Sequence, residues 1–347
     1  MAILKYIPED FIVQEIPGFE ESETGIQIYN LKKRNYTTER AVSQIAQSLH
    51  IPRKFIGYAG TKDKPAITYQ YISIKGKSKD KIINLNLKDI SLEFAGFSKS
   101  EMKLGDLNGN EFEITLRDLP NDFQINLPSE FLVPNYFDEQ RFSNANLDIG
   151  VNLLKQDFKT AIEIIKNTDG DFKEKIELYL EKHKNDFVGA LKILPKKTTL
   201  FYIHSVQSYF FNEILANKIK ENNNFYEINY SQGKLIFADN YEPIDDLPLI
   251  GYMLDEYDEI LSTKNITHQN FIIRSLPNYS LEGSYREAFF KVENFQANNL
   301  QDDEEFVGRK KCVLKFNLKS GAYATIVLKA ILAKQKIELK EERKKLN

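Results

Sequence analysis

The hydrophobic pattern changes twice along this chain of 347 residues, and the order of its three patterns constrains the fold more than any other feature. Up to about residue 145 the apolar residues form short alternating runs, typical of strands, around one helical segment. From about residue 146 they recur at helical spacing, and strand-like runs return at residues 312–317 and 323–328. This order indicates an α+β domain that a mainly helical segment interrupts. The length, too great for one ordinary hydrophobic core, agrees with two domains.

The first part of the chain holds most of the expected strands. They lie at residues 11–15, 26–31, 55–58, 67–74 and 112–117. Thr37 or Thr38 is expected to cap a helix whose apolar stripe ends at Leu49. The Asn-Gly pair at residues 108–109, followed by alternating residues, predicts a hairpin turn. The charged segment 330–346 is expected to be an amphipathic helix or a tail.

Composition excludes several classes of protein. Hydrophobic residues make up 42% and charged residues 28%, as in ordinary globular proteins and unlike disordered chains. No apolar run approaches the roughly 18–20 residues needed to span a bilayer, and the first residues show no cleavable signal pattern. Cys312, the single cysteine, cannot form an intramolecular disulfide, and no Cys/His spacing predicts a metal site. We therefore expect a cytoplasmic protein that binds neither a membrane nor a metal.

Charge is unevenly distributed, although the formal net charge is only −3. Residues 53–103 hold 11 Lys or Arg and 5 Asp or Glu, a local net charge of +6. Residues 239–259 hold 8 acidic residues and no Lys or Arg. The basic stretch is therefore suited to bind a polyanion, and the acidic stretch would repel it. Solvated surfaces without such a role would show the same runs of charged residues.

One loop, residues 57–68, combines two glycines with an aspartate between two lysines. Glycine lets the backbone turn tightly or approach a ligand. Lys62 and Lys64 would keep the carboxylate of Asp63 ionised, as a nucleophile or base requires. An ordinary turn aspartate flanked by solvated lysines would show the same residues, so the loop alone makes Asp63 a candidate and no more.

The segment 134–142 places three aromatic residues, an amide and an arginine within nine residues. Aromatic planes, an amide and a guanidinium suit a splayed-out base and its phosphates. The alternative is a turn whose aromatic side chains belong to the core.

Six motifs together resemble those of the TruD family of tRNA pseudouridine synthases. They lie at residues 5–15, 58–68, 105–112, 135–142, 207–212 and 321–325, in the order of the family. The chain departs from the family at Asp138 and Ser143, where the family usually has glycine, and at Ala330, where it usually has an acidic residue. These departures concern the shape of loops and remove no proposed catalytic group.

The resemblance implies the fold. It is α+β, with a pseudouridine synthase core of a mixed, mostly antiparallel sheet flanked by helices, interrupted by a family-specific α/β insertion domain. We expect the first part of the catalytic core at residues 1–157, the insertion domain at residues 158–297 and the second part of the core at residues 298–347.

The resemblance also implies the reaction and the roles of residues. The family isomerises uridine 13 of tRNA, and a nucleotide inside structured RNA must first be flipped out. By this resemblance Asp63 is the nucleophile and Lys5 is its charge partner. The implied substrate-binding residues are Phe11 and Tyr323, which would stack on the base, Asn135, which would hydrogen-bond substrate, and Phe137, which would wall the pocket.

The expected partner is tRNA, and the basic residues 53–103 would hold its phosphates. An isomerisation conserves atoms, so we expect no metal, redox cofactor, nucleoside triphosphate or other small-molecule cofactor, and glycine fingerprints for phosphate are absent from the sequence. We expect a monomer.

Two other functions fit parts of the sequence. A catalytically silent RNA-binding or RNA-folding protein on the same scaffold would have no physical need for both Asp63 and Lys5. A carbohydrate-active enzyme would need a second acid close to Asp63, whereas Glu9, Asp10 and Glu15 belong to a separate strand.

Overall fold

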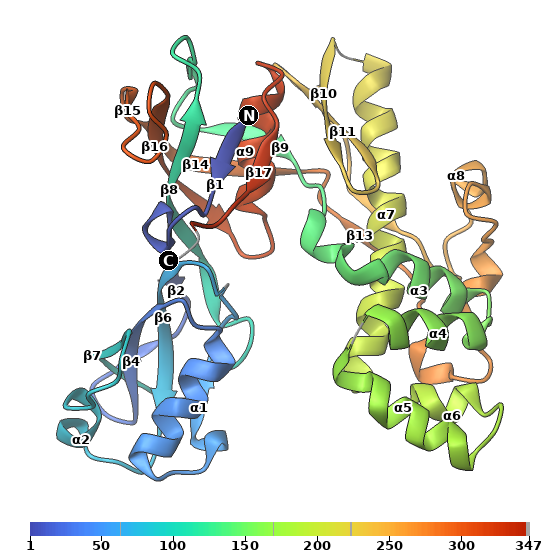
Figure 1. Ribbon diagram of the computed structural model, residues 1–347, viewed down its shortest axis with the longest axis horizontal. Coiled ribbons are helices and arrows are strands. Elements are labelled where there is room, and N and C mark those ends of the chain that lie inside the picture. Colours follow the sequence, from blue (N-terminus) through green and yellow to red (C-terminus); the bar gives the residue numbers. More distant parts are fainter. Residues whose placement is uncertain (63, 169, 223, 345–347) are drawn as a thin grey trace. The chain divides into compact units, whose positions relative to one another are not determined.

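The computed structural model describes residues 1–62, 64–168, 170–222 and 224–344. They fall into two compact units (Figure 1). Met1–Leu132 and Phe290–Asn347 form the first unit, and Val133–Phe289 form the second, so the chain leaves the first unit once and returns to it once. None of the described helices is both long enough and apolar enough to cross a membrane.

The first unit is built around one mixed sheet. Its strands are β1 Ala2–Leu4, β2 Phe11–Pro17, β3 Glu21–Ser22, β4 Ile26–Arg34, β5 Ile56–Tyr58, β6 Ile67–Ile74, β7 Ile90–Ser98, β8 Leu107–Leu119, β9 Phe131–Pro134, β14 Phe289–Ala297, β15 Gln301–Asp302, β16 Lys310–Lys319 and β17 Leu339–Glu341. The central order is β3-β7-β4-β6-β2-β8-β16-β14-β9, and β9 and β14 contain the points at which the chain passes between the units. The pairs β2–β6 and β1–β17 are parallel, and the long ladders of β8 with β2 and β16 are antiparallel. The predicted α+β class, with a mixed and mostly antiparallel sheet, is confirmed.

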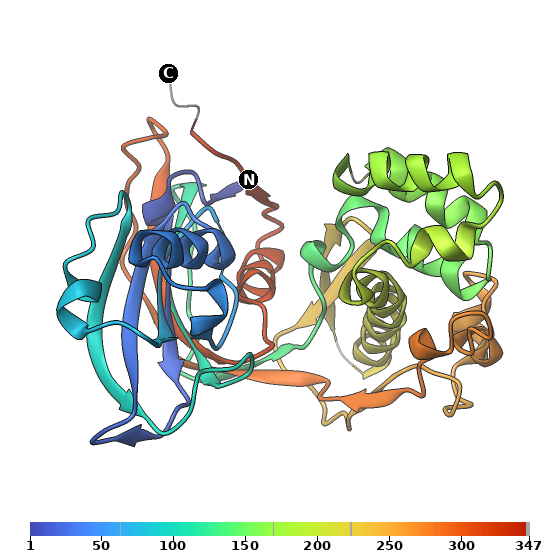
Figure 2. The same ribbon diagram turned by 90° about the horizontal axis from the view of Figure 1, so that it is seen from below.

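Helices cover this sheet. They are α1 Thr38–Leu49, α2 Lys79–Ile83 and α9 Ala324–Ala333, with short 3-10 turns η1 Pro8–Asp10 and η2 Arg53–Phe55. The hydroxyl of Thr37 accepts a hydrogen bond from the backbone N–H of Arg40 at 3.3 Å, which begins α1 as predicted. Figure 2 shows α1 against the strands, where its buried side chains join the apolar face of β4, β5 and β6.

The second unit is built around one long helix. Its helices are α3 Asn146–Leu154, α4 Phe158–Thr168, α5 Gly170–Lys182, α6 Phe187–Leu191, α7 Lys196–Asn222 and α8 Asp258–Ser262, and its 3-10 turns are η3 Glu139–Arg141, η4 Ser143–Ala145, η5 His268–Phe271 and η6 Pro277–Tyr279. Two antiparallel strand pairs complete it: the hairpin of β10 Phe225–Tyr230 with β11 Gly233–Ala238, and β12 Leu247–Leu249 with the distant β13 Ser284–Arg286. Figure 2 looks along α7, which α3, β11, β12 and α8 contact from different sides. Because α7 is surrounded, its apolar residues are not confined to one stripe.

The predicted strand at residues 323–328 is wrong. Tyr323 is the N-cap of α9, and the helix runs through the segment expected to be a strand. Most side chains of α9 are buried, so its apolar residues follow each other without a polar face. A short apolar run with β-branched residues fits a buried helix and a buried strand equally well, and here the tertiary environment decides.

Two further expectations about local structure are wrong. The Asn-Gly pair at residues 108–109 is not a hairpin turn, because both residues lie inside β8, and Gly109 pairs with Ile16 on one side and Lys319 on the other. A Cβ on Gly109 would lie 2.3 Å from the carbonyl oxygen of Leu318, so the glycine serves a close approach of strands. The segment 330–346 is not one helix or tail, since α9 ends at Ala333 and β17 follows.

Candidate active site

The loop that carries the candidate nucleophile is anchored on its N-terminal side. Asp63 itself lies outside the described residues. Beside it, the backbone N–H of Lys62 donates to the hydroxyl of Thr38 at 2.9 Å, and the Gln70 amide donates to the carbonyl of Gly60 at 3.0 Å. Thr38 also donates to Gln70 at 2.9 Å, which closes a buried polar link between α1, β6 and the loop. Such a satisfied network fixes the backbone at Gly60 and Lys62, on the N-terminal side of the loop.

Two cations shielded from solvent lie at this loop: Lys62, which the sequence already placed beside Asp63, and Lys33, which was missed as a site residue. The Nζ of Lys62 lies 2.6 Å from Oε1 of Glu15, whose side chain is fully buried and also accepts from the backbone N–H of Tyr71. The Nζ of Lys33, a fully buried lysine, donates to the carbonyl of Tyr36 at 2.6 Å and lies 3.4 Å from that of Lys62. The signal for Lys33 was its place in β4, where Leu31 and Lys33 alternate on the buried side.

Glu15 changes one argument made from the sequence. It lies on β2, separate from the loop, as expected, but parallel pairing of β2 with β6 brings its carboxylate to Lys62, the residue next to Asp63. The acid is already neutralised by a buried lysine and a backbone N–H. Its contacts are those of a structural anchor, whereas both acids of a carbohydrate-active pair must flank the glycosidic bond.

Lys5 has an unusual backbone and a buried charge. Its φ is +58°, a conformation that residues other than glycine rarely adopt, and the residue is only 6% exposed. Its Nζ lies 2.9 Å from Oε1 of Glu341 on β17 and 4.6 Å from the ring centroid of Phe11. The structure thus brings Lys5 and Phe11 into contact, while the predicted pair of Lys5 with Asp63 falls outside the described residues.

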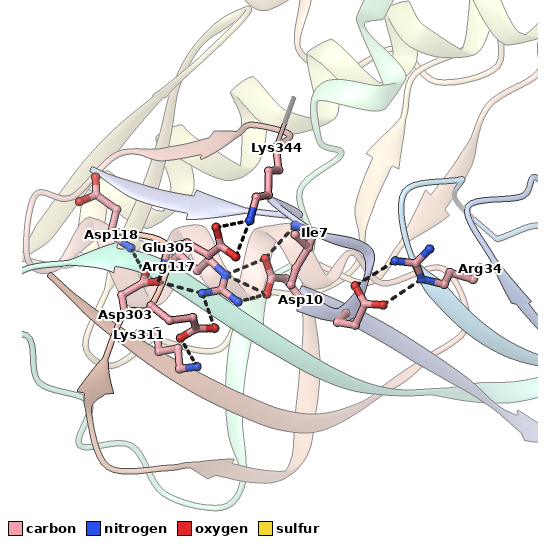
Figure 3. Close-up of polar contacts among 11 residues, drawn as sticks. Ile7, Asp10, Arg34, Arg117, Asp118, Asp303, Glu305, Lys311 and Lys344 are labelled. Atoms are coloured by element: carbon pink, nitrogen blue, oxygen red, sulfur yellow. Dashed lines mark hydrogen bonds and ion pairs between the residues drawn. The ribbon is translucent and has the colours of Figure 1, made fainter. Parts of the chain in front are cut away.

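A buried ionic cluster holds the segment between Lys5 and Phe11 (Figure 3). Asp10 accepts from the backbone N–H of Ile7 at 3.0 Å, and Nε of Arg117 on β8 donates to Asp10 at 2.9 Å. The same guanidinium donates to Asp303 at 2.8 Å and to Glu304 at 3.1 Å. Burial opposes the charge of Arg117, but the hydrogen bonds with these acids outweigh it and raise the pKa of the guanidinium above its ordinary value.

Tyr323 and Phe11, the two predicted stacking residues, lie on different elements of the first unit. Tyr323 directly precedes α9 and follows Gly321, whose φ of +90° turns the chain between β16 and the helix. Phe11 is 5% exposed, with the Lys5 ammonium over its ring and the ring of Phe112 edge-on at 6.1 Å.

Asn135 and Phe137 lie close together in the second unit. The backbone N–H of Phe137 donates to the side-chain oxygen of Asn212 at 2.9 Å, and the Asn212 amide donates back to the Phe137 carbonyl at 2.9 Å. Asn135 donates from Nδ2 to the carbonyl of Glu287 at 2.9 Å. Asn212, on α7, belongs to the motif at residues 207–212, so that motif fixes the backbone of the one at residues 135–142.

The neighbouring Tyr136 belongs to the core, as the alternative interpretation of this segment held. It is fully buried with its ring edge-on to Phe237 at 5.8 Å, and its hydroxyl donates to the carbonyl of Ile236 at 3.0 Å. Burial raises the pKa of Tyr136 well above its ordinary value. The six predicted site residues are therefore divided: Asn135 and Phe137 belong to the second unit, and the rest to the first.

Comparison with known proteins decides the family. A family model described as tRNA pseudouridine synthase D (TruD) matches residues 1–178, 170–246 and 248–331. The chain belongs to the TruD family. Its members are pseudouridine synthases, a class of isomerases, and the resemblance seen in the six motifs is confirmed.

Individual TruD relatives match along nearly the whole chain. A protein of Nanoarchaeum equitans, named "Probable tRNA pseudouridine synthase D", is 30% identical over 94% of this chain and 98% of its own length. A protein of the same name from Thermococcus sibiricus is 29% identical over 95% of this chain and 94% of its own. The crystal structure of a Methanosarcina mazei TruD protein matches with a TM-score of 0.71 and 26% identity, covering 95% of this chain and 93% of that one.

Proposed function

We propose that this chain converts uridine 13 of tRNA to pseudouridine, with Asp63 as the nucleophile acting on a flipped-out nucleotide. The observation that carries the proposal is the family match, which spans the loop of Asp63 as well as the segments of Lys5, Asn135 and Tyr323. The anchored backbone at Gly60 and Lys62 supports a functional role for this loop.

The reaction conserves atoms. The N1–C1′ bond of the uridine breaks, the base turns, a C5–C1′ bond forms, and the hydrogen of C5 leaves while N1 gains a proton. Addition of the carboxylate to the base, its attack on C1′ and its assistance to elimination at the ribose all use the same ionised oxygen. Lys5 serves as the proposed charge partner that keeps this oxygen ionised.

Substrate contacts are proposed for four residues. Phe11 and Tyr323 stack on the base, Asn135 donates or accepts a hydrogen bond, and Phe137 walls the pocket.

The proposed division of the chain assigns catalysis to residues 1–157 and 298–347 and the family-specific domain to residues 158–297. The compact unit Val133–Phe289 overlaps the latter span and supports an inserted domain. We propose that the enzyme works as a monomer in the cytoplasm.

Tritium release from tRNA labelled with [5-³H]uridine tests the nucleophile. Asp63→Asn keeps the shape of the side chain but removes its nucleophilic oxygen, so release should stop while tRNA binding remains. Asp89→Asn is the matched control, because Asp89 is an exposed loop residue with φ +60° and should tolerate asparagine. Residual activity of Asp63→Asn within about tenfold of the wild type would refute its role.

A further substrate and the binding of tRNA by the wild type separate the finer claims. A tRNA with cytidine at position 13 should release no tritium, and release from it at the ordinary rate would move the reaction to another uridine. A wild-type protein that binds tRNA and releases no tritium from any substrate would instead be a silent RNA-binding protein on this scaffold.

A further inference from the structure

Arg286, the last residue of β13, contacts both predicted substrate-binding residues of the second unit. Its guanidinium donates to Oδ1 of Asn135 through Nη2 and lies 3.4 Å from the carbonyl oxygen of the same residue through Nε. It also lies over the ring of Phe137, 4.4 Å from the centroid. No motif of the sequence includes this arginine. A single cation therefore fixes the amide and the aromatic ring relative to each other.

The strand that carries Arg286 is itself anchored. Arg286 pairs with Leu247 in the antiparallel β12–β13 pair, and the backbone N–H of Asn135 donates to the carbonyl of Ala288, two residues after Arg286. The ring of Phe211 on α7 lies 5.7 Å from the guanidinium. The arginine is thus held in place by elements on several sides, as a residue that positions others must be.

These contacts determine which way the Asn135 amide faces. A guanidinium can only donate, so the atom facing Arg286 must be the amide oxygen. The carbonyl of Glu287 can only accept, so the atom facing it must be the amide nitrogen, at 2.9 Å. Two independent neighbours require the same orientation, and a flipped amide would satisfy neither.

One hydrogen of the Asn135 amide nitrogen is left over. The nitrogen carries two hydrogens, and within the described part of the chain the Glu287 carbonyl is the acceptor it contacts. The oxygen already accepts from a cation, and this donation polarises the amide and strengthens its remaining N–H as a donor.

We propose that Arg286 is a positioning residue, which orients Asn135 so that its second amide N–H donates to an acceptor oxygen of the target nucleotide. Asn135 then recognises a carbonyl or sugar–phosphate oxygen and does not accept from the N3–H of uracil. This inference rests on the proposed function, because it assigns a direction to a substrate contact of that site.

Asn135→Asp tests the direction of the hydrogen bond. The carboxylate keeps the shape and the contact with Arg286 but has no N–H to donate, either to the substrate or to the carbonyl of Glu287, so thermal unfolding of the variant must show that the loss of the Glu287 contact leaves the fold intact. If Asn135 donates, kcat/KM for tRNA should fall by about 10²-fold, the loss typical of a removed donor in an active site. If Asn135 accepts from uracil N3–H, the aspartate accepts as well, and a kcat/KM within about threefold of the wild type would overturn the proposal.

A double-mutant cycle tests whether Arg286 acts through Asn135. Arg286→Met should lower kcat/KM about tenfold in the wild type and by less than about twofold when Asn135→Ala is already present. Arg141→Met is the matched control, since Arg141 also lies over the Phe137 ring, at 5.2 Å, and is an arginine of the same unit. Its effect should be the same in both backgrounds. Equal effects of Arg286→Met in both backgrounds would mean that Arg286 only supports the fold.

Thermal unfolding of each variant and modified substrates complete the test. Variants whose Tm stays within a few degrees of the wild type exclude a loss of folding.

In tRNA with 2-thiouridine or 4-thiouridine at the target, a carbonyl oxygen is replaced by sulfur, a weaker acceptor. If one thio substitution slows the wild type but not Asn135→Ala, the acceptor is that base carbonyl; if neither does, it is a sugar–phosphate oxygen. Because wild-type turnover is measured alongside, a wild type without turnover would refute the proposed function and not this inference.

Discussion

The ion pair of Lys5 with Glu341 does not account for the position of this lysine. Glu341 pairs with its ammonium at 2.9 Å, but the glutamate side chain is 53% exposed, so the pair is worth at most about 1 kcal/mol. The positive φ of Lys5 is a strained conformation, which persists only where the surroundings impose it and is common at functional sites. A surface partner of this kind does not explain why a nearly buried lysine occupies that position.

We predict that Lys5→Met lowers the rate of pseudouridine formation by at least tenfold, while Glu341→Gln changes it by less than about threefold. Methionine removes the cation that we propose keeps the nucleophile ionised, whereas Glu341 only pairs with that cation at the surface. Rates of tritium release between pH 6 and 8 provide the measurement. An unchanged rate for Lys5→Met over this range would make Lys5 a structural lysine.

Cys312 gives a second prediction at the scale of single residues. The residue is 3% exposed on β16, and its burial raises the pKa of the thiol to about 11. At pH 8 the thiolate fraction is then about 10⁻³, more than 100-fold below that of a free cysteine. Iodoacetamide should therefore label the native protein at least about 100-fold more slowly than the urea-unfolded protein. Fast labelling of the native state would show that β16 opens readily.

At the scale of elements, the Arg117 cluster joins η1, β8 and the turn after β15 (Figure 3). The side chains of Arg117, Asp10 and Asp303 are each at most 3% exposed. Removing the cation would leave two buried carboxylates without their main partner, which is far costlier than losing a surface pair.

We predict that Arg117→Met lowers the free energy of unfolding by about 3–5 kcal/mol. Lys315→Met is the matched control, because Lys315 pairs with Glu113 across β16 and β8 with both side chains more than 40% exposed, and should cost less than about 1 kcal/mol. Urea titrations followed by circular dichroism measure both. Equal losses in the two variants would show that the buried cluster contributes no more than a surface pair.

Elements were predictable from the sequence where one face is buried and the other is solvated. The alternation in β2 and the stripe of α1 are such cases, and both lie where expected. The prediction failed for α9, which is buried nearly all round, and at Gly109, where strands on both sides and not local turn chemistry select the glycine. Periodicity and turn propensity report the local chain, and these two segments are decided by packing against distant ones.

The candidate site shows the same limit. The residues of the motifs were identified because each motif is continuous in sequence. Arg286 and Lys33 were missed because their roles depend on contacts across about 150 and 30 residues. The alternation in β4 marks Lys33 as buried, but it does not show that the ammonium lies at the loop of Asp63. The pairing of Glu15 with Lys62 likewise follows from the parallel β2–β6 register, which the sequence does not reveal.

At the scale of the whole molecule, folding changes the charge of the basic stretch. Among the described residues of 53–103, four cations form ion pairs with Glu39, Glu15, Glu101 and Glu20. Three of these acids, Glu15, Glu20 and Glu39, lie outside the stretch, so the net charge of +6 becomes +3 once they are included. Lys77 and Lys79 take part in none of the described ion pairs, although Lys79 lies 3.7 Å from the ring centroid of Phe94.

The last prediction concerns how tRNA is held. Affinity should fall steeply with salt, because each phosphate that a lysine neutralises releases condensed counterions. If Lys77 and Lys79 each contact a phosphate, Lys77→Glu with Lys79→Glu should weaken binding and lower the slope of log Kd against log salt by about 2. The rate of the chemical step on bound tRNA should change little, since phosphate contacts position the RNA and do not carry the reaction. Asp255→Asn with Asp258→Asn, in the acidic stretch of the second unit, is the control and should leave the slope unchanged. A slope that responds to the aspartates and not to the lysines would place the RNA on a surface other than the one that carries residues 53–103.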